Sequence, residues 1–283
     1  MGSSAQIGRG RRRCPIGAAL IALVPFLLFV PAPLAAGPEP VASPSPHDYT
    51  VSLRSLPWLA HLEGEVGEAR GVNVAVEADA DLDDDLGLAG LQSFLRGSGN
   101  LRLGRHDFWV TGFDYGNDSR GILDHQITVG RTTFDVQVEL KTELDLTVVH
   151  GKYGYALLGF EESGFRLGPV VNLSYVDLDL EIVAPDVGLR EEIKEKILIP
   201  SLGFHGELPI GDLLLEADAS GVYVNFKDID GAYFRGDASV AWRPLPYVGL
   251  VAGYRVNLVD GHVSDVEFST LLHGPVVGLE LRY

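Results

Sequence analysis

The segment "GPVVGLELRY", residues 274–283, constrains the fold of this chain more than any other feature. Its apolar residues alternate with small or charged ones: Val277, Leu279, Leu281 and Tyr283 against Gly278, Glu280 and Arg282. A period of two residues predicts a β-strand with one apolar and one polar face. Terminal residues of soluble domains are usually polar and loose, so a strand that finishes on an aromatic ring predicts a different environment.

The same alternation recurs from about residue 51 onward and predicts an antiparallel meander. In 246–258, for example, an apolar face alternates with a face that carries Arg255 and Asn257. We expect about ten strands, within a range of eight to twelve: 72–82, 99–115, 120–130, 142–159, 164–182, 196–208, 213–226, 232–243, 247–258 and 266–283. The segment 56–66 also alternates, and it is the alternative first strand, which would move 72–82 into a loop.

The predicted connections come in two sizes. Tight turns are expected at 116–119, 160–163, 209–212 and 244–247, and longer polar loops at 83–98, 131–141, 183–194 and 259–265. Short turns that alternate with longer loops are typical of outer-membrane barrels. The apolar phase also slips by one residue between Val148 and Val149, and again near Tyr175, which predicts a β-bulge at each position.

The polar faces of these segments carry many charged and histidine side chains: Glu143, Asp145, His150, Lys152, Asp177, Asp179, His205, Glu207, Glu216, Asp218, Arg235, Asp237, Arg243, Arg255, Glu280 and Arg282. In a narrow membrane barrel they would point inward and pair across the lumen. We expect a plugged lumen in which the charges are Lys152, Glu207, Arg235, Asp237, Arg243, Arg255, Glu280 and Arg282. The predicted fold is an all-β, up-and-down antiparallel transmembrane β-barrel.

The terminal strand resembles that of bacterial outer-membrane β-barrel proteins, which commonly ends in an aromatic residue after alternating apolar ones. The resemblance implies that Val277, Leu279, Leu281 and Tyr283 form a recognition signal for the barrel-assembly machinery. The stretches 105–136 and "YGYALL" (153–158) are similar to uncharacterised small outer-membrane barrels of the OmpA/OmpW-like group. The resemblance implies an outer-membrane location among lipid and lipopolysaccharide; because that group has no agreed activity, the resemblance identifies no catalytic residues.

The amino-terminal segment has the layout of a secretory signal peptide. Arg9 and Arg11–Arg13 precede an apolar run and the small residues of "PAPLAAG". We expect a signal peptide at 1–36, a flexible leader at 37–54 and the barrel at 55–283. Without the four arginines, 18 basic and 39 acidic residues remain, a balance that argues against nucleic-acid binding.

These features favour a structural or surface-interaction protein, with minor passage of small solutes and without enzymatic activity. One alternative is an outer-membrane hydrolase of the protease or lipid A deacylase type, whose site at the extracellular rim would use Asp260, His262 and Asp265. A second alternative is a soluble periplasmic barrel that binds a lipid.

The acidic loops could attract divalent cations, because carboxylates are the ligands that hard cations prefer. The densest run is Asp83, Asp84 and Asp85, but it lacks the spacing of a known calcium loop. The expectation is therefore a solvated acidic rim without a metal or any other cofactor, with a cation site at these three residues as the alternative.

Overall fold

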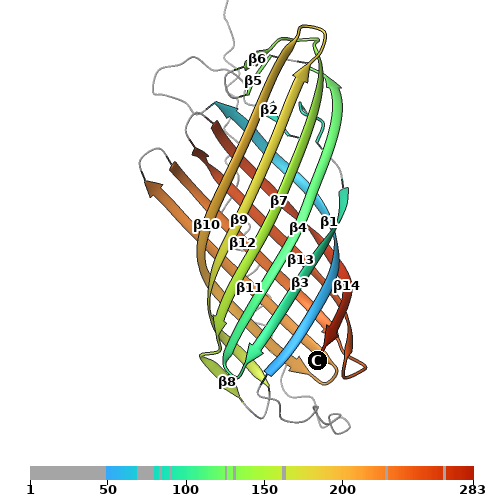
Figure 1. Cartoon of the computed structure of the whole chain (residues 1–283), viewed down its shortest axis with the longest axis vertical. Coiled ribbons are helices and arrows are strands. Elements are labelled where there is room, and N and C mark those ends of the chain that lie inside the picture. The colour runs from blue at the N-terminus through green and yellow to red at the C-terminus, as the bar shows by residue number, and fades with distance from the viewer. Residues whose placement is uncertain are drawn as a thin grey trace, which may run out of the picture. The chain divides into compact units, whose positions relative to one another are not determined.

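The computed structural model describes residues 49–68, 80–82, 85–88, 91–124, 126–129, 132–160, 164–226, 229–263 and 266–283. Within them, ten long strands form a closed antiparallel barrel in up-and-down order (Figure 1). They are β1 (Tyr49–Glu68), β3 (Leu91–Leu103), β4 (His106–Ile122), β7 (Glu139–Tyr155), β9 (Phe165–Ala184), β10 (Leu189–Ile210), β11 (Leu213–Phe226), β12 (Ile229–Trp242), β13 (Val248–Val263) and β14 (Val266–Arg282). The predicted fold class and number of strands are confirmed. No helix among these residues is long and apolar enough to cross a membrane.

The barrel closes where β14 pairs with β1. The register aligns Leu281 with Leu53 and Val276 with Trp58. Tyr283 continues this pairing, because its backbone N–H donates to the Val51 carbonyl at 2.8 Å and its carbonyl accepts from the Val51 N–H at 2.8 Å. The last residue of the chain therefore completes the ladder that leaves the sheet without an unpaired edge, as a strand in lipid requires.

The two ends of the barrel differ, and we name them by their connections. The turn end, at the bottom of Figure 1, holds the C-terminus and the connections 104–105, 156–164, 211–212 and 243–247. The loop end holds the connections after β1, β4, β9, β11 and β13. Two of the predicted long loops are wrong: β9 and β10 leave only 185–188 between them, and β13 runs on to Val263. Strands of 13 to 22 residues exceed the roughly 9–11 that span a bilayer, so polar segments predicted as loops continue the ladder beyond it.

The first third of the chain differs from the predicted strand boundaries. The first strand is β1, the alternative at 56–66, and it begins at Tyr49, before the predicted barrel start at residue 55. Most of the predicted strand 72–82 lies outside the described residues, and its last part holds β2 (Ala80–Asp81), which pairs with β1. The predicted turn at 116–119 lies inside β4. The actual turn is at 104–105, where Gly104 adopts a φ of 57° that favours glycine.

Neither of the predicted bulges exists. The β7–β9 ladder runs without interruption from Lys141–Val183 to Gly154–Val170, through both expected positions. Leu144 and Lys152 therefore lie on the same inward face of β7, although one is apolar and the other charged. The apparent slip of phase marks a change of surroundings along the strand, from a water-facing to a lipid-facing outer surface.

The outward face near the turn end is apolar. Its exposed side chains include Leu53, Leu95, Val110, Val171, Leu198, Leu202, Phe204, Leu250, Val277 and Leu279. Leu202 and Phe204 have 68% and 66% of their surface exposed. A contiguous exposed surface of this kind marks contact with a partner or with lipid, and we call it the apolar belt.

Toward the loop end the outward face becomes polar. Glu143, Asp145, Asp177 and Asp179 point outward here, so their predicted place in the lumen is wrong. Cross-strand ion pairs join β10 to β9, where the Lys194 ammonium lies 2.9 Å from Asp179. Hydrogen bonds to Glu192 and Asp179 raise the pKa of Lys194. The charged groups indicate that this part of the wall faces water.

Connecting segments build a second apolar core at the loop end. It includes β5 (Ile127–Val129) and β6 (Thr132–Phe134), which form a hairpin beside β1 and β10. The buried side chains of this core are Leu82, Leu86, Leu88, Leu123, Ile127, Val129 and Phe134. We name these residues the cap. Two inward residues of β4 hold it, because Asn117 donates to the Leu88 carbonyl at 2.9 Å and Ser119 donates to that of Leu86.

Candidate functional site

The barrel interior near the turn end is filled by ion pairs. The Arg54 guanidinium lies 2.7 Å from Glu216 and 2.8 Å from Glu280. Arg243 also binds Glu280, with 2.7 Å between Nε and Oε2. Glu280 keeps only 1% of its side-chain surface exposed, so its charge depends on these two arginines.

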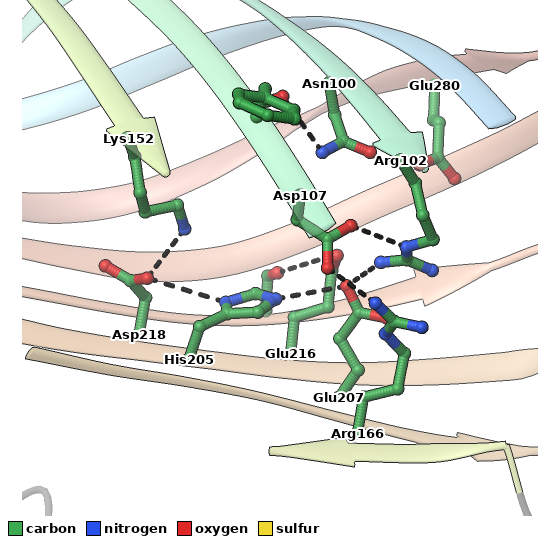
Figure 2. Close-up of polar contacts among 12 residues, drawn as sticks. Asn100, Arg102, Asp107, Lys152, Arg166, His205, Glu207, Glu216, Asp218 and Glu280 are labelled. Carbon is green, nitrogen blue, oxygen red and sulfur yellow. Dashed lines mark hydrogen bonds and ion pairs between the residues drawn. The ribbon is translucent and has the colours of Figure 1, made fainter. Parts of the chain in front are cut away.

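A second network crosses the same zone, and Figure 2 shows its side chains converging; they come from β3, β4, β7, β9, β10 and β11. Asp107 accepts from Arg102 at 2.6 Å and from Arg166 at 2.7 Å. Arg102 also pairs with Glu207, which lies 3.0 Å from the His205 ring. The other ring nitrogen of His205 is 3.5 Å from Asp218, which binds the Lys152 ammonium at 2.6 Å.

Both networks surround a small polar cavity of about 80 Å³. Its lining includes Arg54, Arg102, Lys152, Glu207, Asp218 and Arg282. Side chains that pair across a narrow barrel occupy the space through which ions would pass. We call this region the charged zone.

The interior changes character toward the loop end, where a larger cavity of about 180 Å³ has apolar walls. Its aliphatic lining includes Leu144, Leu146 and Val148 from β7, Val176, Leu178 and Leu180 from β9, and Ile193, Ile197 and Ile199 from β10. Leu82 of the cap also contributes to the lining. Among the described residues that line the cavity, Glu195 is the one that carries a carboxylate. We call this cavity the apolar chamber.

An aromatic cluster supports the chamber on the side of β1, β3 and β4. The Trp58 ring lies 5.0 Å from Phe94 and 5.4 Å from Phe113, centroid to centroid. Phe94 also contacts Tyr115 at 5.4 Å. Trp58 is fully buried, and its tilted and edge-on neighbours are the arrangements that aromatic rings prefer. Packed aromatic rings from β1, β3 and β4 therefore form this part of the barrel interior.

The charged zone and the apolar chamber meet at a layer of four residues that line both cavities: Thr111, His150, Arg235 and Arg255. Arg255 is 2% exposed, pairs with Asp237 and lies over the Trp58 ring, with its guanidinium carbon 5.4 Å from the centroid. His150 binds the Ser174 hydroxyl through Nδ1 at 2.7 Å. A ligand in the chamber would reach basic groups at this layer.

The predicted lumen charges all lie inside the barrel: Lys152, Glu207, Arg235, Asp237, Arg243, Arg255, Glu280 and Arg282. Sequence reasoning missed five further charged residues in or beside these networks, namely Arg54, Arg96, Arg102, Asp107 and Arg166. Of these, Arg54 and Arg102 pair with the predicted charges Glu280 and Glu207. Sequence reasoning also missed the apolar chamber. The available signal was the alternation of Leu144, Leu146 and Val148, which line the chamber, ahead of the one-residue slip of phase at Val149.

The residues proposed for an alternative hydrolase are only partly described. Asp260 and His262 lie two residues apart near the loop end of β13, and Asp260 accepts from the Ser269 hydroxyl at 3.3 Å. Asp265 and the side chain of His262 lie outside the described residues. The catalytic interpretation therefore stays a prediction.

The alternative cation site is similarly placed. Asp83 and Asp84 lie outside the described residues, whereas the Asp85 carboxylate accepts from the backbone N–H of Asp81 at 2.8 Å. In the part of the chain that the structure describes, no group of three histidine or acidic side chains is arranged to hold a metal ion. The metal alternative stays a prediction.

The terminal strand presents its alternating residues outward. Val277, Leu279, Leu281 and Tyr283 are 59%, 54%, 57% and 71% exposed. Their side chains extend the apolar belt, while Glu280 and Arg282 point inward. The four apolar residues are thus accessible on the outer surface, next to the seam between β14 and β1.

Comparisons with known proteins support the fold. Neither a family model nor a curated protein matches the sequence. The outer membrane protease OmpT of Escherichia coli superimposes with a TM-score of 0.57 at 10% identity, over 83% of this chain and 97% of that one. The P. putida toluene transporter TodX gives 0.32 at 10% identity, over 84% and 91%. Ail of Yersinia pestis gives 0.32 at 11% identity, over 83% and 99%.

The likeness to OmpT shows that this chain has the fold of an outer-membrane β-barrel, as the resemblance of the terminal strand implied. An identity of 10% shows nothing of activity. The TM-scores of TodX and Ail are too low to carry a structural argument.

Proposed function

We propose that this protein is an integral barrel of the bacterial outer membrane that is closed to ions and binds a small apolar molecule in its interior. The observation that carries the proposal is the apolar chamber of about 180 Å³ above a charged zone. An engineered cavity of about 150 Å³ with apolar walls stays dry and binds benzene, so the chamber is large enough for one ring-sized molecule.

Export and orientation follow from the same proposal. The signal peptide at 1–36 would direct the chain across the inner membrane, and the barrel-assembly machinery would recognise β14. The turn end would face the periplasm and the loop end the outside, as in other outer-membrane barrels. Outer-membrane lipid and lipopolysaccharide would surround the apolar belt.

The alternative of a soluble lipid-binding barrel needs a polar outer surface. Leu202 and Phe204 are instead more than half exposed on the outside of the barrel, among other large apolar side chains. Such a surface would aggregate in water, whereas it is stable in lipid. The chamber is thus a ligand site inside a membrane barrel.

We expect no steady ion conductance when the purified barrel is inserted into a planar bilayer. The paired side chains of the charged zone occupy the lumen, and each pair would have to break to admit a hydrated ion. Single-channel recording at about 1 M salt would test this, with a porin of known conductance as the positive control. Regular ohmic steps from the wild-type protein would contradict the closed lumen.

We expect benzene to bind saturably in the chamber. The measurement is methyl NMR of isoleucine-labelled protein in lipid nanodiscs, in which Ile193, Ile197 and Ile199 line the chamber. Ile122 and Ile210 are exposed outside it and report partition into the surroundings. Binding shifts the first three methyl signals with saturation, whereas partition shifts the other two in proportion to benzene concentration.

A matched pair of variants locates that binding. Val148→Phe places a larger side chain inside the chamber, whereas Val149→Phe adds the same group on the outside of the same strand. The first substitution is expected to abolish the saturable shifts and the second to leave them unchanged. Saturable shifts that survive Val148→Phe would disprove the chamber as the site.

A further inference from the structure

The floor of the apolar chamber contains a surplus of positive charge. Arg235 and Arg255 line both cavities, and Arg96 lines the polar cavity and donates to Thr111 of the boundary. The exposed fractions of Arg96, Arg235 and Arg255 are only 6%, 6% and 2%. Guanidinium groups keep their charge in proteins, so these three bring three positive charges into the middle of the barrel. We call them the arginine layer.

Few carboxylates balance the arginine layer. Asp237 pairs with Arg255, and one of its oxygens lies 3.9 Å from the guanidinium of Arg235. Among the described residues, the partner of Arg96 is a hydroxyl group, since its guanidinium donates to Thr111 at 3.3 Å. Among the described residues no second carboxylate forms an ion pair with these arginines. Asp218 lies nearby, but it is bonded to Lys152. These two opposite charges cancel, so the surplus of positive charge from the arginines remains.

The layer also contains polar atoms that lack protein partners. Arg96 Nε, Arg255 Nε and His150 Nε2 are buried and make no hydrogen bond within the described part of the chain. A buried donor without a partner costs about 1–3 kcal/mol, and more when it is charged. Arg96 Nε and Arg255 Nε are donors, whereas the role of His150 Nε2 depends on the tautomer of the ring. Two charged donors without a partner near one boundary favour the binding of an acceptor from outside the chain.

We propose that the ligand of the apolar chamber is a small amphiphile with one anionic head, such as an aromatic or short-chain carboxylate, whose head binds the arginine layer. The proposal rests on the proposed function, because it assigns the chemistry of the molecule in the chamber. The head would neutralise part of the surplus charge and accept from the free donors of Arg96 and Arg255. The apolar body would then lie against Val148, Leu178 and Ile197.

Other ligand classes satisfy only part of this site. A neutral apolar molecule fills the chamber but leaves the arginine donors unpaired. A small hydrophilic anion such as acetate binds arginine but leaves the apolar walls uncovered. A two-chain phospholipid exceeds a cavity of about 180 Å³. A cation would meet the same positive layer and be repelled.

The test compares probes of equal size and different charge. Benzoate and benzyl alcohol are titrated into the full-length mature protein in nanodiscs, at constant ionic strength, with the isoleucine methyl signals of the chamber as the readout. Wild-type protein is expected to bind benzoate about tenfold or more tightly than benzyl alcohol, because a charge-assisted hydrogen bond to arginine is stronger than a neutral one. Acetate is expected to bind more weakly than benzoate, because it lacks the apolar body.

Arg96→Gln is the informative substitution. It removes one charge and breaks no ion pair within the described part of the chain, where the partner of Arg96 is the Thr111 hydroxyl. The variant is expected to lose most of the preference for benzoate while its affinity for benzyl alcohol stays the same. Arg282→Gln is the matched control: Arg96 and Arg282 both line the polar cavity and not the chamber, but Arg96 donates to Thr111, which lines both cavities, whereas no described contact joins Arg282 to a residue that lines both. It should keep the wild-type preference.

The outcomes separate this inference from the proposed function. Equal affinities for benzoate and benzyl alcohol, both insensitive to Arg96→Gln, would overturn the anionic head and leave an apolar site in place. Acetate that binds as tightly as benzoate would also overturn it, since the chamber would then contribute nothing. If benzene, benzyl alcohol and benzoate all failed to shift the chamber methyl signals, the proposed function itself would fail.

Discussion

Replacing Glu280 by glutamine is expected to lower the free energy of unfolding by about 3 kcal/mol. The carboxylate accepts from Arg54 at 2.8 Å and from Arg243 at 2.7 Å, and it is almost fully buried. Glutamine has nearly the same shape as glutamate, so the expected loss of stability comes from the missing negative charge. Removing one member of a buried ion pair typically costs about 3–5 kcal/mol, and the partial exposure of the two arginines favours the lower value.

Urea unfolding in liposomes measures this loss, with tryptophan fluorescence and migration of the unheated protein on a gel as two probes of the folded fraction. Glu143→Gln is the matched control, because it makes the same chemical change on an exposed outward position of β7. The control should stay within about 0.5 kcal/mol of wild type. Equal effects of the two substitutions would show that the charged zone contributes no more to stability than the outer surface does.

The second half of the barrel could be predicted from the sequence because its alternation is regular and its turns carry strong signals. In β13 and β14 each lipid-facing position is apolar and most inward positions are charged or small. The inward positions include Arg255 and Glu280, which the chain brings into contact with Asp237 and Arg54. Register in such strands is set by the apolar face, so the residues that share the lumen followed directly.

The first half could not be predicted in the same way. The segment "GNDS" consists of residues that favour turns, yet Asn117 and Ser119 use their side chains to bind carbonyl groups of the cap. The actual turn at 104–105 contains one glycine, Gly104, and Arg102 and Arg105 lie on either side of it. Arg102 is charged because its side chain pairs with Asp107 inside the barrel. The turn preference of residues 116–119 was therefore overridden by tertiary hydrogen bonds, and the turn at 104–105 was hidden by arginines, one of which forms an ion pair in the lumen.

The apolar chamber was not predicted, because the apolar face of each strand was assumed to point outward along its whole length. A strand that crosses lipid has its apolar residues outside, whereas the continuation beyond the lipid has water outside and must place its apolar residues inside. On β7 the inward face passes from Leu144 and Val148 to His150 and Lys152 without any break in the ladder. A one-residue change of apolar phase in a long strand can thus mark the limit of the membrane as well as a bulge.

The limit of the membrane along each strand leads to the second prediction of a large loss of stability. Replacing Leu202 by arginine is expected to destabilise the folded barrel by about 2–4 kcal/mol, the cost of a cation on the lipid face near the midplane. Leu202 is 68% exposed and lies on β10 between Leu198 and Phe204, which are also directed outward. The charge has no partner in hydrocarbon and cannot reach water as easily as it could from the rim of the belt.

Thr147→Arg is the control that makes the result specific to the membrane. It adds the same charge to an exposed outward position of β7, on the loop-end side of Val149 and opposite Asp114. We expect a change of no more than about 1 kcal/mol there, because the group faces water. The two variants are compared by urea unfolding in liposomes, as for Glu280. Comparable destabilisation by both would place the lipid boundary elsewhere, whereas tolerance of Leu202→Arg would mean that the apolar belt does not face lipid, and the outer-membrane assignment would fall with it.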